Sequence, residues 1–411
     1  MHSRLHFIIH AAPLLLVIFI DSIGLGLIIP VLSGLIFNPS STFLSGNLNT
    51  PFMQNLIYGA VLGVFMLCWF FGAVVLGDLS DKIGRKKSLL ICLFGAFLSY
   101  IFSAISVSMH SISLLLLGRI ISGLTSGSQP IAQAAVIDMS HPEQKTRNMS
   151  YMYLSLSLGF IMGPLLGGIL ADNRIVSWFN FATPFYFAAL LSLANMLLLY
   201  GLFKESFVAK KQKIRIQFFS AVKLFISAFK PGKLKNMSIL YIIFIFGWAS
   251  FFSFCSAFLI KSYEFSPTQV SIYMSLMGVG FCIGNAFLVE LTSRWWSNRQ
   301  IFAYASLGCA VIAFLTIAIH HPFVNWFLVI GIGAFVASSG PTVMSLFSDT
   351  VDKDSQGWVM GVMGSIMALV WGINGVVVGA LSSWGAALPI YVAALFLLLS
   401  ALLTPYFIRK N

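Results

Sequence analysis

Asp21 is the one acidic residue that lies well inside a strongly apolar stretch of this sequence. The stretch runs from about residue 7 to 37, and Gly24, Gly26 and Pro30 follow the acid within it. Inserting a carboxylate there costs about 2.5 to 3.5 kcal/mol, and burial favours the neutral acid. The chemistry that suits such a group is reversible proton binding from a wet cavity. The alternative is structural, with Asp21 capping backbone groups that the glycines and the proline leave free.

Arg119 lies equally deep in another apolar stretch, and a guanidinium group keeps its charge at any ordinary pH. Inside a membrane it therefore needs a carboxylate, backbone carbonyls or water as a partner. Asp21 is the only comparably deep acid, so the sequence predicts that the two act together in proton coupling. A nearby cation favours the ionised acid, which opposes the effect of burial. The alternative is that Arg119 only holds its own helix against that of Asp21.

The composition indicates which elements must position these two residues. Of 411 residues, 58% are hydrophobic and 9% are charged, whereas a soluble domain has about 25% charged residues. A membrane span needs about 20 mostly apolar residues, and the chain has room for about twelve such spans with short loops. The sequence therefore predicts an all-α integral membrane protein.

The distribution of charge gives an orientation. A net charge of +12 could suggest nucleic acid as a partner, but the cations lie in short loops beside the spans. Alternate loops hold nearly all of them, and the other side holds only Arg174 and Lys261. By the positive-inside rule both termini are cytoplasmic. We expect a multi-pass protein of the bacterial inner (plasma) membrane that binds no nucleic acid.

The cysteine residues predict neither a metal site nor a cofactor. They are scattered singly through apolar stretches, without C-x-x-C spacing or a nearby histidine, which is typical of small core residues. The first apolar stretch is also too long for a cleavable signal peptide, so we expect it to be retained as the first helix. The five cysteines are Cys68, Cys92, Cys255, Cys282 and Cys309.

The densest run of charge, at residues 77–87, predicts a sharp cytoplasmic turn between the second and third spans. Its pattern G-x-L-x-D-x-x-G-R-[KR]-[KR] resembles the loop between helices two and three of the major facilitator superfamily. The resemblance implies a latch, in which Asp81 faces the start of helix eleven and Arg85 pairs with an acid ending helix four. The alternative is a solvated turn that only obeys the positive-inside rule. The latch residues are Gly77, Asp81, Gly84, Arg85, Lys86 and Asp138.

Further stretches resemble the tetracycline and multidrug efflux proteins of that superfamily. The pattern D-x-x-G-x-G-x-x-x-P begins at Asp21, and R-x-x-x-G begins at Arg119. Helix five carries G-x-x-x-G-P-x-x-G-G, which resembles the motif of the family's antiporters. As packing alone, glycines at this spacing would let another backbone approach closely. The helix-five residues are Gly159, Gly163, Pro164, Gly167 and Gly168.

The resemblance implies a fold of twelve transmembrane helices in two six-helix bundles, which is the major facilitator fold. We place the N-terminal bundle at 1–203, a cytoplasmic linker at 204–235 and the C-terminal bundle at 236–411. The linker holds nine cations and apolar residues at nearly helical spacing. These predict an amphipathic helix on anionic lipid, with a partner protein as the alternative.

Together these patterns predict a proton-coupled secondary active transporter that exports a small amphipathic compound or drug by alternating access. Its partners would be the cargo, protons and membrane lipids, and we expect a monomer. The alternative is a proton symporter that imports a nutrient or a siderophore-like metal chelate, against which only the helix-five motif argues. An enzyme is not expected, because no span or loop carries a catalytic constellation.

The cargo is not readable from the chain. Tetracycline exporters also carry acids within helices three and nine, whereas residues 88–109 and 301–319 hold none here, so tetracycline is a doubtful cargo. Polar or aromatic residues inside the spans are candidates for lining a substrate cavity, and each could equally serve helix packing. These candidates are Gln129, Gln133, Asn195, Trp248, Asn285, Trp371 and Asn374.

Overall fold

The computed structural model describes residues 2–140, 145–206, 219–229, 231–319, 321–352 and 355–407, and all regular elements in these ranges are helices. The all-α fold predicted from the sequence is thus confirmed. The chain divides into two compact units. Unit 1 comprises Met1–Val31 and Cys68–Ser220, and unit 2 comprises Leu32–Leu67 and Ala221–Asn411. The predicted domain boundaries at 203 and 236 stay a prediction.

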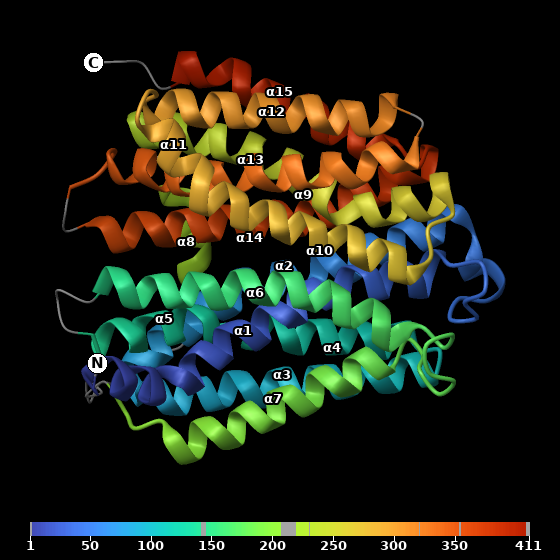
Figure 1. Cartoon of the computed structure of the whole chain (residues 1–411), viewed down its shortest axis with the longest axis horizontal. Coiled ribbons are helices and arrows are strands. Elements are labelled where there is room, and N and C mark those ends of the chain that lie inside the picture. The colour runs from blue at the N-terminus through green and yellow to red at the C-terminus, as the bar shows by residue number, and fades with distance from the viewer. Residues whose placement is uncertain are drawn as a thin grey trace. The chain divides into compact units, whose positions relative to one another are not determined.

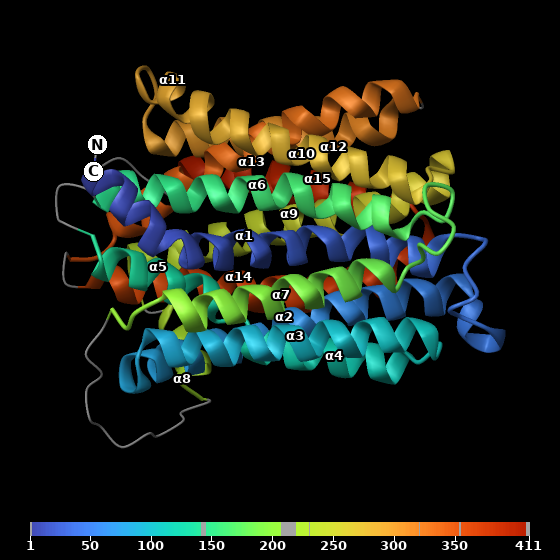
Figure 2. The same cartoon turned by 60° about the horizontal axis from the view of Figure 1, so that its bottom comes forward.

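The helices of unit 1 run alongside one another (Figures 1 and 2). Apolar side chains from six of them form a buried core. The helices that contribute wholly or partly to this unit are α1 (His2–Phe37), α2 (Pro51–Ile83), α3 (Arg85–Ser108), α4 (Ile112–Thr125), α5 (Ser128–Asp138), α6 (Lys145–Ala171) and α7 (Thr183–Leu202).

We predicted a sharp turn in the charged run at residues 77–87, and most of this run is helical. The helix α2 continues through it to Ile83, and only Gly84 separates α2 from α3. The ion pair of Asp78 with Lys82 at four-residue spacing favours the helical conformation, and the pair of Asp81 with Arg85 bridges the break at Gly84. Gly84 has a φ of 98°, a conformation that glycine adopts without the steric cost of a Cβ atom.

The predicted fourth span is divided in two. The helix α4 ends at Thr125 and α5 begins at Ser128, with Ser126 and Gly127 between them. Each piece is too short to cross a membrane alone, so the described residues contain 11 helices that are long and apolar enough to span a bilayer. The count of twelve crossings stays a prediction, in which α4 and α5 together make one.

Unit 2 also contains the end of α1 and the first half of α2. Tyr58 of α2 donates a hydrogen bond to the Ser253 carbonyl at 2.6 Å, and Lys261 donates to the Asn55 side chain at 2.8 Å. Its other elements are α8 (Phe219–Ser227), α9 (Lys233–Tyr263), α10 (Pro267–Ile283), a π-helical segment (Gly284–Leu288), α11 (Val289–Ser293), α12 (Asn298–Ala318), α13 (Pro322–Ser348), α14 (Gln356–Leu381) and α15 (Leu388–Phe407).

Candidate functional site

Asp21 lies half-buried in α1 and faces the break in helix four. The hydroxyl of Ser128, the first residue of α5, donates a hydrogen bond to the Asp21 carboxylate. The first N–H groups of a helix have no partner within the helix, and its dipole favours a negative charge at that end. The break after Thr125 therefore places the N-terminus of α5, which carries no formal charge, where it stabilises the ionised form of Asp21.

Arg119 is almost wholly buried in α4, with 1% of its surface exposed. Its Nη2 donates a hydrogen bond to the Ser103 hydroxyl of α3 at 3.1 Å, while its Nε has no hydrogen-bond partner among the described residues. The ion pairs found in the described part of the chain do not include one between Arg119 and Asp21. A direct pairing of the two stays a prediction.

Tyr100 of α3 lies beside the segment of α1 that holds Asp21, and we did not predict it from the sequence. It is buried, with 6% of its surface exposed, and it interacts electrostatically with both Arg119 and Asp21. Its hydroxyl also occupies the place that a Cβ atom on Gly24 would take. A signal did exist, because Ser99 and Ser103 share a helix face at four-residue spacing and mark a polar side of α3 beside the tyrosine.

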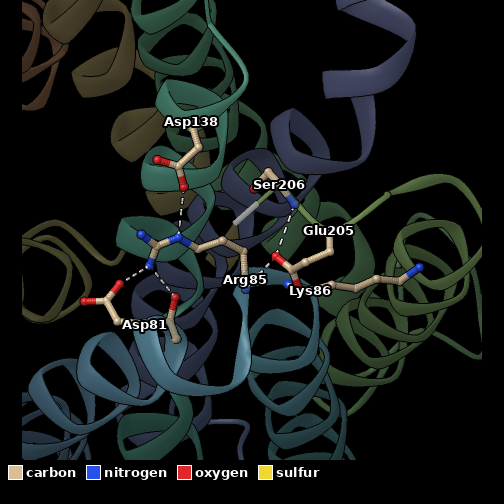
Figure 3. A network of polar contacts seen from close by, with 7 residues as sticks. Asp81, Arg85, Lys86, Asp138, Glu205 and Ser206 are labelled. Atoms are coloured by element: carbon tan, nitrogen blue, oxygen red, sulfur yellow. Dashed lines mark hydrogen bonds and ion pairs between the residues drawn. The ribbon is translucent and has the colours of Figure 1, made fainter. Parts of the chain in front are cut away.

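Arg85 is the centre of a polar network at the start of α3 (Figure 3). Its Nη1 donates to Asp81 at 2.7 Å and to the Ser80 hydroxyl at 2.6 Å, and its Nε donates to Asp138 at 3.2 Å. The network joins the end of α2, the start of α3 and the end of α5. The contact that we expected between Asp81 and the start of the eleventh span, which is α14, would join the two units, and it stays a prediction.

Glu205, three residues after the end of α7, completes this network from a second side. Its carboxylate accepts hydrogen bonds from the backbone N–H groups of Arg85, at 2.9 Å, and Lys86, at 3.1 Å (Figure 3). Lys86 in turn donates to the Tyr200 carbonyl of α7 at 2.7 Å. A Cβ atom on Gly84 would overlap the Glu205 carboxylate. The sequence analysis missed Glu205, although it is the single acid of the basic linker.

We predict that Glu205→Ala loosens the start of α3. The two amides that Glu205 accepts from are at a helix N-terminus and have no partner within the helix. A carboxylate there is worth about 0.3 to 1 kcal/mol when exposed, so the Arg85 and Lys86 amides should exchange with solvent deuterium about two- to fivefold faster. Lys204→Ala is the control and should leave this exchange unchanged. Equal exchange in both variants would show that Glu205 does not hold the helix.

The motif predicted for the fifth span lies on α6, and its glycines face α1. A Cβ atom on Gly163 would lie 2.6 Å from the Ile23 carbonyl oxygen and 3.1 Å from the Gly26 Cα, and one on Gly167 would lie 3.1 Å from the Leu27 carbonyl oxygen. Gly159 meets α1 at Ser22 in the same way, and Pro164 contacts Gly26; Gly168 is buried. The stripe therefore sets how closely α6 approaches the segment of α1 that holds Asp21.

Three of the cavity candidates lie in unit 1. Gln129 and Gln133 are half-buried on α5, one turn apart, so they share a face of that helix. Asn195 of α7 is fully buried, and neither atom of its amide group has a hydrogen-bond partner among the described residues. Gln129 and Gln133 thus lie on the same helix as Ser128, the hydrogen-bond donor of Asp21.

The other four lie in unit 2 and differ in their surroundings. The rings of Trp248 and Trp371 both contact Phe252, with centroids 5.3 and 5.5 Å away. Asn374 instead donates to Ser250 at 2.7 Å and to the Phe246 carbonyl at 3.1 Å, and so fastens α14 to α9. Asn285 is exposed within the π-helical segment.

Known proteins resemble this chain along nearly its whole length. Residues 14–375, and again 237–411, match the model of the Major Facilitator Superfamily. The chain is 28% identical over 420 residues to the tetracycline resistance protein, class H, of Pasteurella multocida, which covers 97% of this chain and 96% of the relative. It is 25% identical over 392 residues to the quinolone resistance protein NorA of Staphylococcus aureus, which covers 92% and 90%.

Solved structures agree on the fold. The crystal structure of a D-xylose-proton symporter covers 99% of this chain and 98% of its own, with a TM-score of 0.74 and 16% identity. At that identity the likeness supports the fold alone. The family assignment rests on the match of the sequence to the family model. The chain belongs to the Major Facilitator Superfamily, and it is a multi-pass membrane transporter and not an enzyme.

Proposed function

We propose that this transporter exports a small amphipathic compound in exchange for protons, as a monomer in the inner membrane with cytoplasmic termini. The observation that carries the proposal is the surroundings of Asp21, an acid inside a span with the Ser128 hydroxyl as its hydrogen-bond donor. The direction is supported by the relatives, whose names describe resistance to tetracycline and to quinolones. A membrane transporter confers resistance by removing a compound from the cell.

In this proposal Asp21 binds and releases the coupling proton. Burial favours the neutral acid, whereas the start of α5 favours the carboxylate. Because these two effects oppose each other, a modest change in hydration or the arrival of cargo is enough to change the protonation state. Arg119 would also favour the carboxylate if it moved toward Asp21 during the cycle.

The network around Arg85 would control access from the cytoplasm. Arg85 at the start of α3 is bound by Asp81 of α2, by Asp138 of α5 and by Glu205 after α7, so these four helix ends would move as one body. The Asp81 side chain is 58% exposed, and we propose that it docks at the start of α14 when the cytoplasmic side closes. A carboxylate at a helix N-terminus gains about 0.3 to 1 kcal/mol, and up to about 2 when partly buried.

Transport in inside-out membrane vesicles tests this function. With ethidium and norfloxacin as probes, an acidic vesicle interior should drive accumulation of at least one probe, and an ionophore that collapses the pH gradient should abolish it. At one proton per cargo, each pH unit can sustain about a tenfold concentration ratio. Vesicles from cells that lack the protein are the control. Proton-driven uptake of a nutrient into whole cells, without export of either probe, would favour the symporter instead.

A further inference from the structure

The linker helix α8 has two apolar faces, where an amphipathic helix would have one. One face packs within unit 2: Ala221 is fully buried, and Leu224 lies 3.2 Å from the place of a Cβ atom on Gly361, in α14. The opposite face exposes Phe219 by 76% and Ile226 by 62%. These two residues are seven positions apart and share one side of the helix. This exposed apolar surface is not buried by unit 2, so we expect another partner to bury it.

The position of α8 indicates that lipid buries this surface. The helix ends at Ser227, and α9, which has the length and composition of a membrane span, begins at Lys233. So short a connection keeps α8 near the membrane surface. Figure 1 shows α8 running across the direction of α14. A helix whose axis crosses the spans lies along the membrane plane, where its exposed apolar residues reach the boundary between headgroups and acyl chains.

The charge of the surrounding chain selects the kind of lipid. Lys223 is exposed on α8, and Lys233 and Lys235 begin α9. Residues 204–235 carry nine cations, while their single acid, Glu205, is engaged at the start of α3. Cations at the membrane surface attract anionic headgroups, whereas neutral headgroups gain no such attraction. Charge and exposed apolar surface therefore point to the same partner.

We propose that α8 is a lipid-responsive lever: anionic lipids of the cytoplasmic leaflet bind its outer face and, through Leu224 on Gly361, hold the first turns of α14 in place. Since α14 is the helix expected to receive Asp81, lipid composition would set how readily the cytoplasmic side closes. The lipid contact rests on the membrane location of the chain, and its effect on closure rests also on the proposed docking of Asp81 at α14. Neither depends on the identity or direction of the cargo.

The first test locates the outer face. The full chain, with its five cysteines replaced by serine and Ile226→Cys labelled with an environment-sensitive fluorophore, is placed in nanodiscs of phosphatidylcholine alone or mixed with phosphatidylglycerol. We expect quenching by nitroxide-labelled acyl chains, stronger with phosphatidylglycerol and weakened by salt. In a titration with short-chain phosphatidylglycerol, Lys223→Gln should lower the apparent affinity about fivefold. A label that acyl-chain nitroxides do not quench would overturn the proposal.

The second test examines the lever without any cargo. In the wild-type chain, phosphatidylglycerol should slow hydrogen exchange in the first turns of α14 about fivefold. This factor corresponds to the free energy of one added contact between a cation and an anionic lipid. Leu224→Ala should keep the lipid contact of the Ile226 label but remove this slowing. If phosphatidylglycerol leaves the exchange of α14 unchanged in the wild type, α8 is only an anchor and the proposal fails. Neither measurement depends on whether the protein exports or imports.

Discussion

Asp21→Asn should abolish proton-driven accumulation of cargo while leaving the protein folded. Asparagine is nearly isosteric with aspartic acid and resembles its neutral form, so the contact with the Ser128 hydroxyl can persist. The variant cannot release a proton, and an imposed pH gradient then does no work on the cargo. In inside-out vesicles the cargo ratio should fall from about tenfold per pH unit to one. Exchange of cargo down its own gradient should continue.

Two further variants make this result interpretable. Glu290→Gln removes the charge of a carboxylate that is 71% exposed and paired with Arg294, and it should transport like the wild type. Asp21→Glu keeps a titratable group in the same helix and should retain part of the coupling. Accumulation by Asp21→Asn under a pH gradient would place the coupling proton elsewhere. Asp21 would then be a structural cap, which was the alternative reading of the sequence.

Much of the fold could be predicted because membrane spans are long and their composition is extreme. The structure differs from the prediction at two places. Gly77 and Gly84 were read together as the ends of a turn, but the ion pair of Asp78 with Lys82 at four-residue spacing supports α2 past Gly77, and Gly84 alone lies at the break. The interruption of helix four at Ser126 and Gly127 was also not predicted. Glycine is tolerated inside transmembrane helices, so a serine followed by a glycine does not by itself indicate a break.

The candidate site was predictable where a residue type is costly in its surroundings. A carboxylate or a guanidinium in an apolar run demands an explanation, which singled out Asp21 and Arg119 from the sequence alone. Their actual neighbours, Ser128, Ser103 and Tyr100, are ordinary residues in membrane helices. Which of them meets a charged group depends on how each helix is rotated about its axis, and a nearly uniform apolar sequence leaves that rotation undetermined.

Gly163→Leu should stop transport with little loss of the protein from the membrane. The Cβ atom alone would lie 2.6 Å from the Ile23 carbonyl oxygen and 3.0 Å from the Ile23 Cα. These are backbone atoms and cannot rotate away, so α6 and α1 must separate. Overpacking of this kind costs about 1 to 3 kcal/mol, and a separation at Ile23 also displaces Asp21, which lies two residues before it on the same helix. Transport of either probe should therefore fall below detection.

Gly201→Leu is the matched control, because a Cβ atom on Gly201 of α7 would meet nothing within 4 Å. It introduces the same side chain into a helix of the same unit and should transport normally. Gly163→Ala adds only the Cβ atom and should give an intermediate rate, which keeps the comparison informative if the leucine variant does not accumulate in the membrane. Transport at the wild-type rate by a folded Gly163→Leu would mean that α1 and α6 can separate freely. The close approach of the two helices would then have no part in holding Asp21 at the start of α5.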